Sequence, residues 1–173
     1  TELKYILGLD RFEEQVNQNN NQDNVGYELR RYFQLLKKTN SQVLELLYNI
    51  EWLELDDKFK SLVLDNKEKF LNTEYTFKSL MGYVQGERRL LDGSRSGKLG
   101  SKRKESLAKY GYSKSNLVQC LRLCWAGAYF FMHQIYPVNI PKYDSNFAAQ
   151  LMDIKQNPAK YNKESAAILV DVW

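Results

Sequence analysis

The chain has 173 residues, of which 43% are hydrophobic and 27% are charged, a composition typical of a folded globular protein rather than a disordered one. Nine glycines and three prolines exclude collagen-like and low-complexity classes and favour helix. No apolar run reaches the ~18 residues that a membrane span needs, so we expect a cytoplasmic protein. The net charge of +4 weakly favours anionic partners such as nucleotides or RNA.

The first part of the chain predicts a polar loop, a short strand and then helices. The Asn- and Gln-rich run from Asn17 to Asn24 indicates a loop, and Val25-Gly26-Tyr27 indicates a short strand. The next apolar positions follow the i, i+3, i+4, i+7 spacing of a helix: Leu29, Tyr32, Phe33 and Leu36. A second helix carries Val43 to Leu47, and a third stretch of helical pattern covers 56–70.

The remainder of the sequence is helical with short connections. Helices are predicted at 74–91 after an Asn72-Thr73 cap, at 102–109 before Gly111, and from Ser113 or Ser115 to about Ile135. A helix starting at Asp144-Ser145 and a final one over 165–173 follow, with Pro158 between them. The fold class is therefore α+β and mainly helical.

The cysteines and the histidine carry little chemistry. Cys120 and Cys124 are four residues apart inside an apolar stretch, which favours buried thiols over a metal pair. His133 is the only histidine, so a His-based metal site or a Ser-His-Asp triad is excluded in practice.

A glycine-containing loop superficially resembles a phosphate-binding motif. The segment Gly93-Ser94-Arg95-Ser96-Gly97-Lys98 has three residues between its glycines and Leu99 after the lysine, so it fails the P-loop pattern. It also fails as a nucleotidyltransferase Gly-Ser turn, because no Asp-x-Asp follows. The stretch 95–109 nevertheless holds six basic residues and one acid, which suits either phosphate binding or a solvated surface.

Two single residues are more informative. Arg122 is the only formally charged residue between Lys114 and Lys142, and it stands beside leucines in the most apolar helix. A charge in that position must reach solvent, form an ion pair or hold a ligand anion, and the sequence leaves a structural pair and a phosphate contact both open. Glu28 lies at a strand-to-helix junction, where a carboxylate either binds Mg²⁺ or simply complements the helix dipole.

A succession of short segments is the most specific feature of the chain. In order, these segments are 5–13, 23–33 (DNVGYELRRYF), 40–47 (NSQVLELL), Gly82-Tyr83, 109–112 and 121–123. Their succession resembles the predicted nucleotidyltransferases of the DNA polymerase beta superfamily. The similarity is to the bacterial and phage group of RNA-ligase-associated polymerase-beta-like proteins, and it extends from Tyr5 to about Leu169.

The resemblance implies Mg²⁺-dependent transfer of a nucleoside monophosphate from an NTP to a hydroxyl on RNA, protein or a small molecule. It implies that Glu28 is the third, metal-binding and catalytic carboxylate of a two-metal site. Arg122, Lys114, Lys98 and Arg103 are the residues that it implies for binding the nucleotide phosphates. Many relatives have histidines where this chain has Asn116 and Gln119.

The resemblance also implies a domain division and a missing part. Residues 1–71 would be the C-terminal part of the nucleotidyltransferase core, with the remnant of a small mixed sheet, and 72–173 a helical domain. The family's Gly-Ser turn and Asp-x-Asp strand come before the block that starts at Tyr5, so we expect a chain cut at its ends. Such a chain is expected to be inactive unless an N-terminal fragment or a partner subunit completes it. The alternatives are a non-catalytic module that binds RNA or a protein, and a helical structural subunit.

Overall fold

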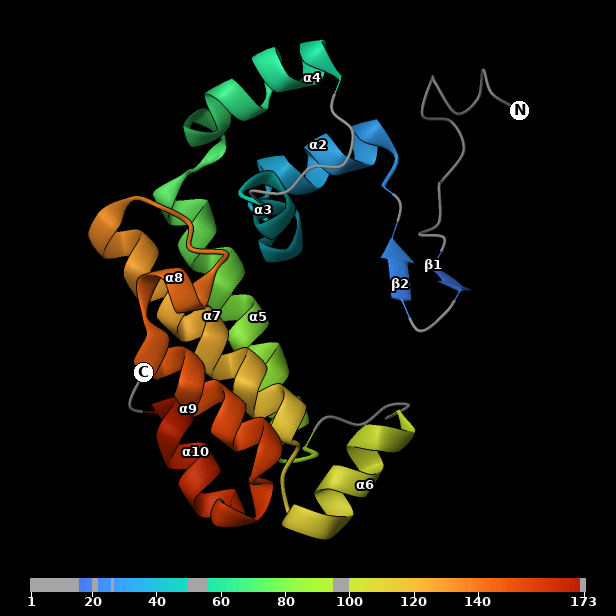
Figure 1. Ribbon diagram of the computed structural model, residues 1–173, viewed down its shortest axis with the longest axis vertical. Helices are drawn as coiled ribbons and strands as arrows, with labels where there is room; N and C mark the ends of the chain where they lie inside the picture. Colours follow the sequence, from blue (N-terminus) through green and yellow to red (C-terminus); the bar gives the residue numbers. More distant parts are fainter. Residues whose placement is uncertain (1–15, 20–21, 26, 50–55, 95–99, 172–173) are drawn as a thin grey trace.

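The computed structural model describes residues 16–19, 22–25, 27–49, 56–94 and 100–171. Within them the chain is mainly helical, as the sequence predicts (Figure 1). The elements in chain order are β1 (Val16–Asn19), β2 (Gln22–Val25), α2 (Leu29–Lys37), α3 (Ser41–Leu47), α4 (Asp57–Leu62), the 3₁₀ helix η1 (Leu64–Phe70), α5 (Thr73–Leu91), α6 (Ser101–Tyr110), α7 (Lys114–His133), α8 (Ile140–Tyr143), α9 (Ser145–Gln156), the 3₁₀ helix η2 (Pro158–Lys160) and α10 (Lys163–Asp171).

The strands of the described residues form one antiparallel pair. Val16 lies opposite Val25, and Asn19 lies opposite Gln22. The prediction of a loop over 17–24 is therefore wrong for 17–19 and 22–24, the part of that run which the structure describes. The reason is that strands pair through backbone N–H and C=O groups, so a polar run without apolar alternation can still pair. A small mixed sheet of the polymerase beta type stays a prediction.

Side-chain caps explain where several helices begin. Glu28, Asn40, Asp56 and Asn72 each accept hydrogen bonds from backbone N–H groups in the first turn of α2, α3, α4 and α5 respectively. Such caps satisfy donors that the helix itself leaves without a partner. Gly111 ends α6 with φ at +75°, a conformation that glycine adopts without steric cost.

The stretch 56–70, predicted as one helix, is broken in two. Asn66 has φ −120° and ψ 17°, outside the helical range, and its Nδ2 donates to the backbone oxygen of Ser61 at 2.8 Å. An asparagine side chain that bonds to nearby backbone competes with the regular helical ladder. The regular helix α4 ends at Leu62, with Val63 as its C-cap, and the Asn66 kink lies inside the 3₁₀ helix η1 that follows.

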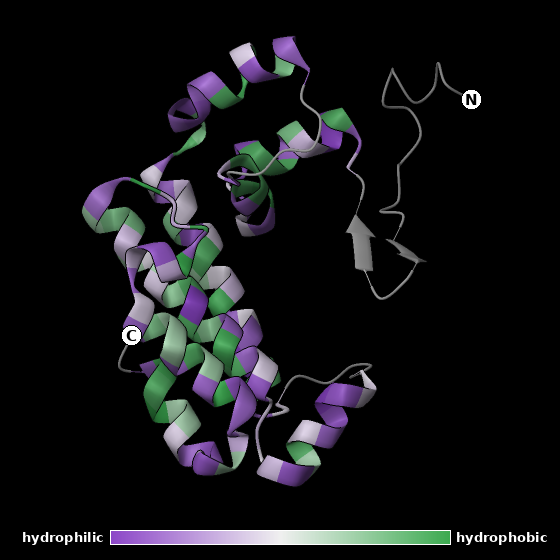
Figure 2. Cartoon of the chain, viewed as in Figure 1, coloured by the Kyte–Doolittle hydropathy of each residue, from purple (hydrophilic) through white to green (hydrophobic). Residues whose placement is uncertain are grey.

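The helices α5 and α7 lie side by side and form the spine of the molecule (Figure 1). A Cβ added at Gly127 of α7 would lie 3.3 Å from Cδ1 of Leu80 of α5, so the two helices approach closely there. Apolar side chains concentrate on α7 (Figure 2). Its opposite side packs against α9 and α10, and the buried residues there include Leu117, Leu121, Trp125, Phe147, Ile154 and Ala166.

A second apolar cluster joins the N-terminal helices to the segment after α7. It contains Leu36 of α2, Leu44 and Leu47 of α3, and Tyr136. Cys120 and Cys124 are free thiols of α7, and burial raises the pKa of the Cys120 thiol to about 12. No helix among the described residues is both long and apolar enough to cross a lipid bilayer.

Candidate functional site

A line of polar side chains runs between α5 and α7 in an otherwise apolar interface. On α7, Asn116, Gln119 and Arg122 follow one another at spacings of three, and on α5, Tyr83 and Glu87 are four apart, so each set lies on one helix face. Two further helices contribute to this line. We call the whole set the polar seam: Gln42 and Glu45 of α3, Tyr83 and Glu87 of α5, Arg103 of α6, and Asn116, Gln119 and Arg122 of α7.

Arg122 forms one end of the polar seam. Its Nη2 lies 2.9 Å from Oε1 of Glu45, and its Nε donates to Oε1 of Gln119 at 3.2 Å. The Arg122 and Glu45 side chains are 29% and 27% exposed, so the pair is shielded but reachable from solvent. A guanidinium has five N–H groups, and these two contacts use only part of them. The structural pair that the sequence left open is therefore present, and it leaves donors for a further acceptor.

Two tyrosines enclose the Arg122–Glu45 pair. Tyr83 is hydrogen-bonded to Gln42, and its pKa is raised mainly by burial and also by the charges of Glu87 and Glu45. Tyr136 is 2% exposed, and burial, with the nearby charge of Glu45, raises its pKa. Both phenols are thus neutral at physiological pH and can act as hydrogen-bond donors beside the ion pair.

Asn116 forms the other end of the polar seam and is 2% exposed. Its Oδ1 accepts from Nε of Arg103 at 2.9 Å and from Oγ of Ser113 at 2.5 Å, while its Nδ2 donates to Oε2 of Glu87 at 2.5 Å. One amide therefore joins a cation of α6 to an anion of α5. Each end of the seam therefore contains one arginine and one glutamate, Arg122 paired directly with Glu45, and Arg103 and Glu87 both bonded to Asn116.

The other basic residues predicted from the sequence have separate positions. Lys114 begins α7, and its Nζ donates to the backbone oxygen of Lys155 in α9 at 3.3 Å. Its backbone N–H donates to Oγ of Ser106 in α6, which fixes the α6–α7 corner. Lys98 lies outside the described residues. The structure therefore brings Arg103 and Arg122 to the seam and directs the ammonium group of Lys114 toward α9.

Glu28 stands between β2 and α2, at the strand-to-helix junction that the sequence predicts. Its Oε1 accepts from the backbone N–H of Arg30 at 2.9 Å and its Oε2 from that of Arg31 at 2.8 Å. Each carboxylate oxygen keeps a second lone pair. Capping α2 therefore does not prevent the carboxylate from binding a cation.

The donor chemistry of Glu28 fits Mg²⁺, which takes one or two protein carboxylates together with substrate phosphates. Within the described ranges, however, no group of three or more His, Cys, Asp or Glu side chains is placed to hold a metal ion. Among the described residues, Glu28 thus stands without a cluster of further metal-binding side chains.

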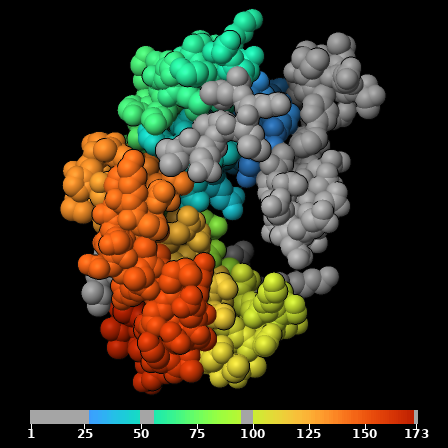
Figure 3. Space-filling model, viewed as in Figure 1, coloured from blue at the N-terminus to red at the C-terminus, as the bar shows by residue number. Residues whose placement is uncertain are grey.

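An open space separates α3 from α6 alongside α7 (Figure 3). These helices contribute Glu45, Arg103 and Arg122 to the seam. The seam thus contains two guanidinium groups, and guanidinium groups are suited to an anionic ligand.

Comparison with protein families identifies the family of this chain. The model of the RNA repair pathway DNA polymerase beta family (RlaP) matches residues 2–164, which is nearly the whole chain. The chain belongs to this family. The resemblance drawn from the sequence is thereby confirmed, and membership of the RlaP family indicates a role as a polymerase-beta-like nucleotidyltransferase. No curated protein and no solved structure matches the chain.

Some residues of the seam are not predicted as site residues from the sequence. Glu45 lies in the segment 40–47 and Tyr83 in the pair Gly82-Tyr83, both of which carry the family resemblance, but neither residue is assigned a role there. Asn116 and Gln119 stand out only as replacements for histidines. The available signal is Glu87, which is seven residues from Leu80 and four from Leu91 and therefore lies on the helix face that carries these buried leucines.

Proposed function

We propose that this RlaP-family protein takes part in the Mg²⁺-dependent transfer of a nucleoside monophosphate from an NTP to a hydroxyl acceptor. The observation that carries the proposal is the family match over residues 2–164. The polar seam adds support, since Arg103 and Arg122 supply cationic donors from the neighbouring helices α6 and α7.

In the proposed reaction Arg122 binds phosphate oxygens of the NTP with the N–H groups that Glu45 and Gln119 do not use. Guanidinium suits this task because its planar donors match pairs of phosphate oxygens. Glu45 holds the guanidinium in place through its contact with Nη2. Arg103 is held in the same way by Asn116 and adds positive charge at the other end of the seam. The proposal extends to Lys114 and Lys98 as further phosphate contacts.

Glu28 is proposed to supply one carboxylate for metal binding and catalysis. Bound Mg²⁺ ions would stabilise the charge that develops at the α-phosphate and on the leaving pyrophosphate. The described residues do not gather the other carboxylates. We therefore propose that an N-terminal fragment or a partner subunit supplies them, and that this chain by itself does not catalyse transfer.

A non-catalytic module that binds RNA or a protein is the alternative. It is favoured by one observation, that the described residues assemble no carboxylate cluster. A module of this kind would bind anions through the same arginines without transferring a nucleotide.

Nucleotide binding by Arg122 is tested with a matched pair of variants. Arg122→Leu is expected to weaken NTP binding about ten- to a hundredfold, the value of a charge-assisted hydrogen bond. Glu45→Gln breaks the same ion pair but leaves the guanidinium in place, so NTP affinity should be unchanged or tighter. Both are measured by isothermal titration of NTP and Mg²⁺ into the chain, with melting temperatures as the check on folding. Equal loss of affinity in both variants would mean that Arg122 serves only as a structural partner of Glu45.

A further inference from the structure

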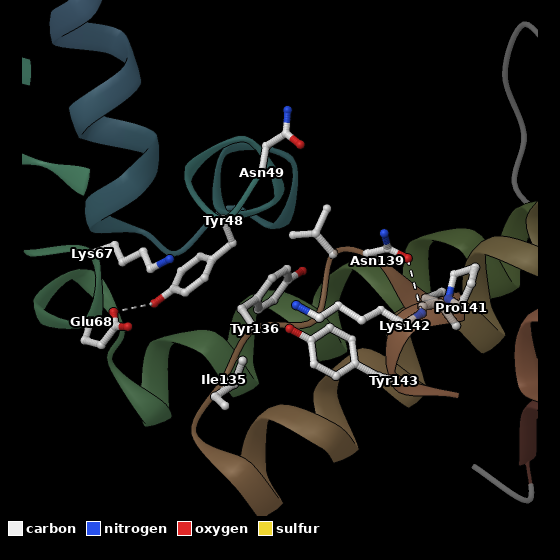
Figure 4. Close-up of a pocket in the computed structure, with 12 residues that line it drawn as sticks. Tyr48, Asn49, Lys67, Glu68, Ile135, Tyr136, Asn139, Pro141, Lys142 and Tyr143 are labelled. Carbon is white, nitrogen blue, oxygen red and sulfur yellow. Dashed lines mark hydrogen bonds between the residues drawn. The ribbon is translucent and has the colours of Figure 1, made fainter. Parts of the chain in front are cut away.

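A second concave site lies outside the polar seam, between η1 and the segment that follows α7. It has a volume of about 660 Å³, within the range of small-molecule sites. Three tyrosines, two lysines and a glutamate line it (Figure 4): Tyr48, Tyr136, Tyr143, Lys67, Lys142 and Glu68. We call it the tyrosine pocket. Of these residues only Tyr136 also lies near the Arg122–Glu45 pair, and none of the six is assigned a contact with the NTP in the function proposed above.

The three rings differ in how accessible they are. Tyr48 and Tyr136 are 8% and 2% exposed, and their ring centroids are 6.1 Å apart, so they form a fixed apolar floor. Tyr143 is 36% exposed and is supported from α7 by the ring of Tyr129, at a centroid distance of 5.0 Å. The tyrosine pocket therefore offers one supported ring that a planar ligand can stack on.

The two lysines lie above these rings. Nζ of Lys67 is 5.0 Å from the centre of the Tyr48 ring, and Nζ of Lys142 is 5.7 Å from that of Tyr143. Neither ammonium group lies within ion-pair distance of a carboxylate in the described part of the chain. Both charges thus remain available to an anion, and a lysine that moves to an anion uncovers the ring beneath it.

The pocket also contains one anchored acceptor. Oε2 of Glu68 accepts from the hydroxyl of Tyr48 at 3.3 Å, which holds the carboxylate at the edge of the pocket (Figure 4). A carboxylate repels phosphate but accepts hydrogen bonds from ribose hydroxyls and from base amino groups. The ligand must therefore combine an aromatic face, an anionic group and neutral hydrogen-bond donors.

A nucleotide has all three features. We infer that the tyrosine pocket binds one nucleotide unit, with the base stacked on Tyr143 and the phosphate held by Lys67 and Lys142. Ribose or base donors then face Glu68. Two sources share this chemistry, a free nucleoside phosphate and one residue of a single-stranded RNA.

A second lysine-rich groove provides an internal comparison. It is lined by Lys37 and Lys38 at the end of α2 and by Tyr75 and Lys78 of α5, with a volume of about 620 Å³. Tyr75 is 53% exposed, and Lys78 is paired with Glu74. Like the tyrosine pocket, this groove carries positive charge, but it has no floor of buried rings. Comparing the two sites therefore separates the contribution of charge to binding from the contribution of stacking.

The inference is tested by substitution at both sites. Binding of AMP is measured by isothermal titration, and that of a fluorescein-labelled ten-nucleotide single-stranded RNA by fluorescence anisotropy. Tyr143→Ala is expected to weaken binding about tenfold or more through loss of stacking, whereas Tyr143→Phe keeps the ring and the affinity. The double variant Lys67→Ala/Lys142→Ala should weaken binding. In a plot of the logarithm of the RNA-binding constant against the logarithm of salt concentration, its slope should be less steep by about one unit.

The outcomes separate the two sources and the two sites. If the substitutions weaken the affinity for AMP and for RNA in parallel, the pocket is a site for a free nucleotide. If they weaken the affinity for RNA alone, it is a site for one residue within an RNA strand. Tyr75→Ala should leave both affinities unchanged. The inference is overturned if Tyr143→Ala binds both probes like the wild type, or if only Tyr75→Ala weakens binding. Because Arg122 lies outside the pocket, failure here leaves the NTP titrations of Arg122→Leu and Glu45→Gln unaffected.

Discussion

Replacing Glu28 by glutamine is expected to reduce nucleotidyl transfer by about a hundredfold or more in the completed enzyme, while the protein stays folded. The amide removes the negative charge with which Glu28 would attract a divalent cation. The helix cap largely survives, since the remaining carbonyl oxygen can still accept from the backbone N–H of Arg30 or Arg31, so the free energy of unfolding should fall by less than about 1 kcal/mol. The measurements are steady-state transfer rates at saturating Mg²⁺ and urea unfolding.

Asp56 provides the matched control for Glu28. It caps α4 with a carboxylate that accepts from the backbone N–H of Phe59 at 2.9 Å, so Asp56→Asn is the same chemical change at another helix start. We expect Asp56→Asn to retain the wild-type rate. Equal losses of rate in the two variants would mean that Glu28 acts only as a helix cap.

Replacing Asn116 by alanine is expected to lower the free energy of unfolding by about 3 kcal/mol or more. Its buried amide bonds to Arg103, Ser113 and Glu87, and two of these partners are charged. Hydrogen bonds to charged groups contribute about 1.5–3 kcal/mol each, and partly buried partners left without a bond add a desolvation penalty. Urea unfolding measures the change, and a loss below about 1 kcal/mol would contradict this account of the seam.

An exchange of side-chain types tests the Asn116 contacts more specifically. Asn116→Asp keeps the acceptor for Arg103 but places a carboxylate against Glu87, so it should destabilise the protein. Adding Glu87→Gln restores an amide donor opposite a carboxylate acceptor. The double variant is therefore expected to be about 1–3 kcal/mol more stable than Asn116→Asp alone. If the two variants unfold at the same urea concentration, the contact between positions 87 and 116 contributes nothing to stability.

The sequence predicted the helices well because local signals determine them. Caps such as Asn72, the glycine at 111 and the periodic apolar positions of α7 each act within a few residues. The prediction was wrong where hydrogen bonds, which hydrophobic periodicity does not reveal, decided the local structure. The side-chain bond from Asn66 accompanies a kink inside η1, and backbone pairing forms strands from a polar run.

The candidate site was less predictable because its contacts join distant parts of the chain. Arg122 was identified as an isolated charge in an apolar helix, but its partner Glu45 lies in α3 and carries no local mark. The tyrosine pocket likewise depends on Tyr48 and Tyr136 meeting across the fold. Sequence reasoning can find a charge that needs a partner, whereas only the tertiary structure identifies that partner.

The most direct test of the account is transfer of labelled nucleotide to an RNA hydroxyl. The 173-residue chain is incubated with Mg²⁺, α-labelled NTPs and a short RNA, alone and together with a polypeptide that carries the Gly-Ser turn and Asp-x-Asp strand of the family. We expect label on the RNA only in the second reaction. Robust transfer by the chain alone would contradict the proposal that its carboxylates are insufficient, and no transfer in either reaction would favour the non-catalytic module.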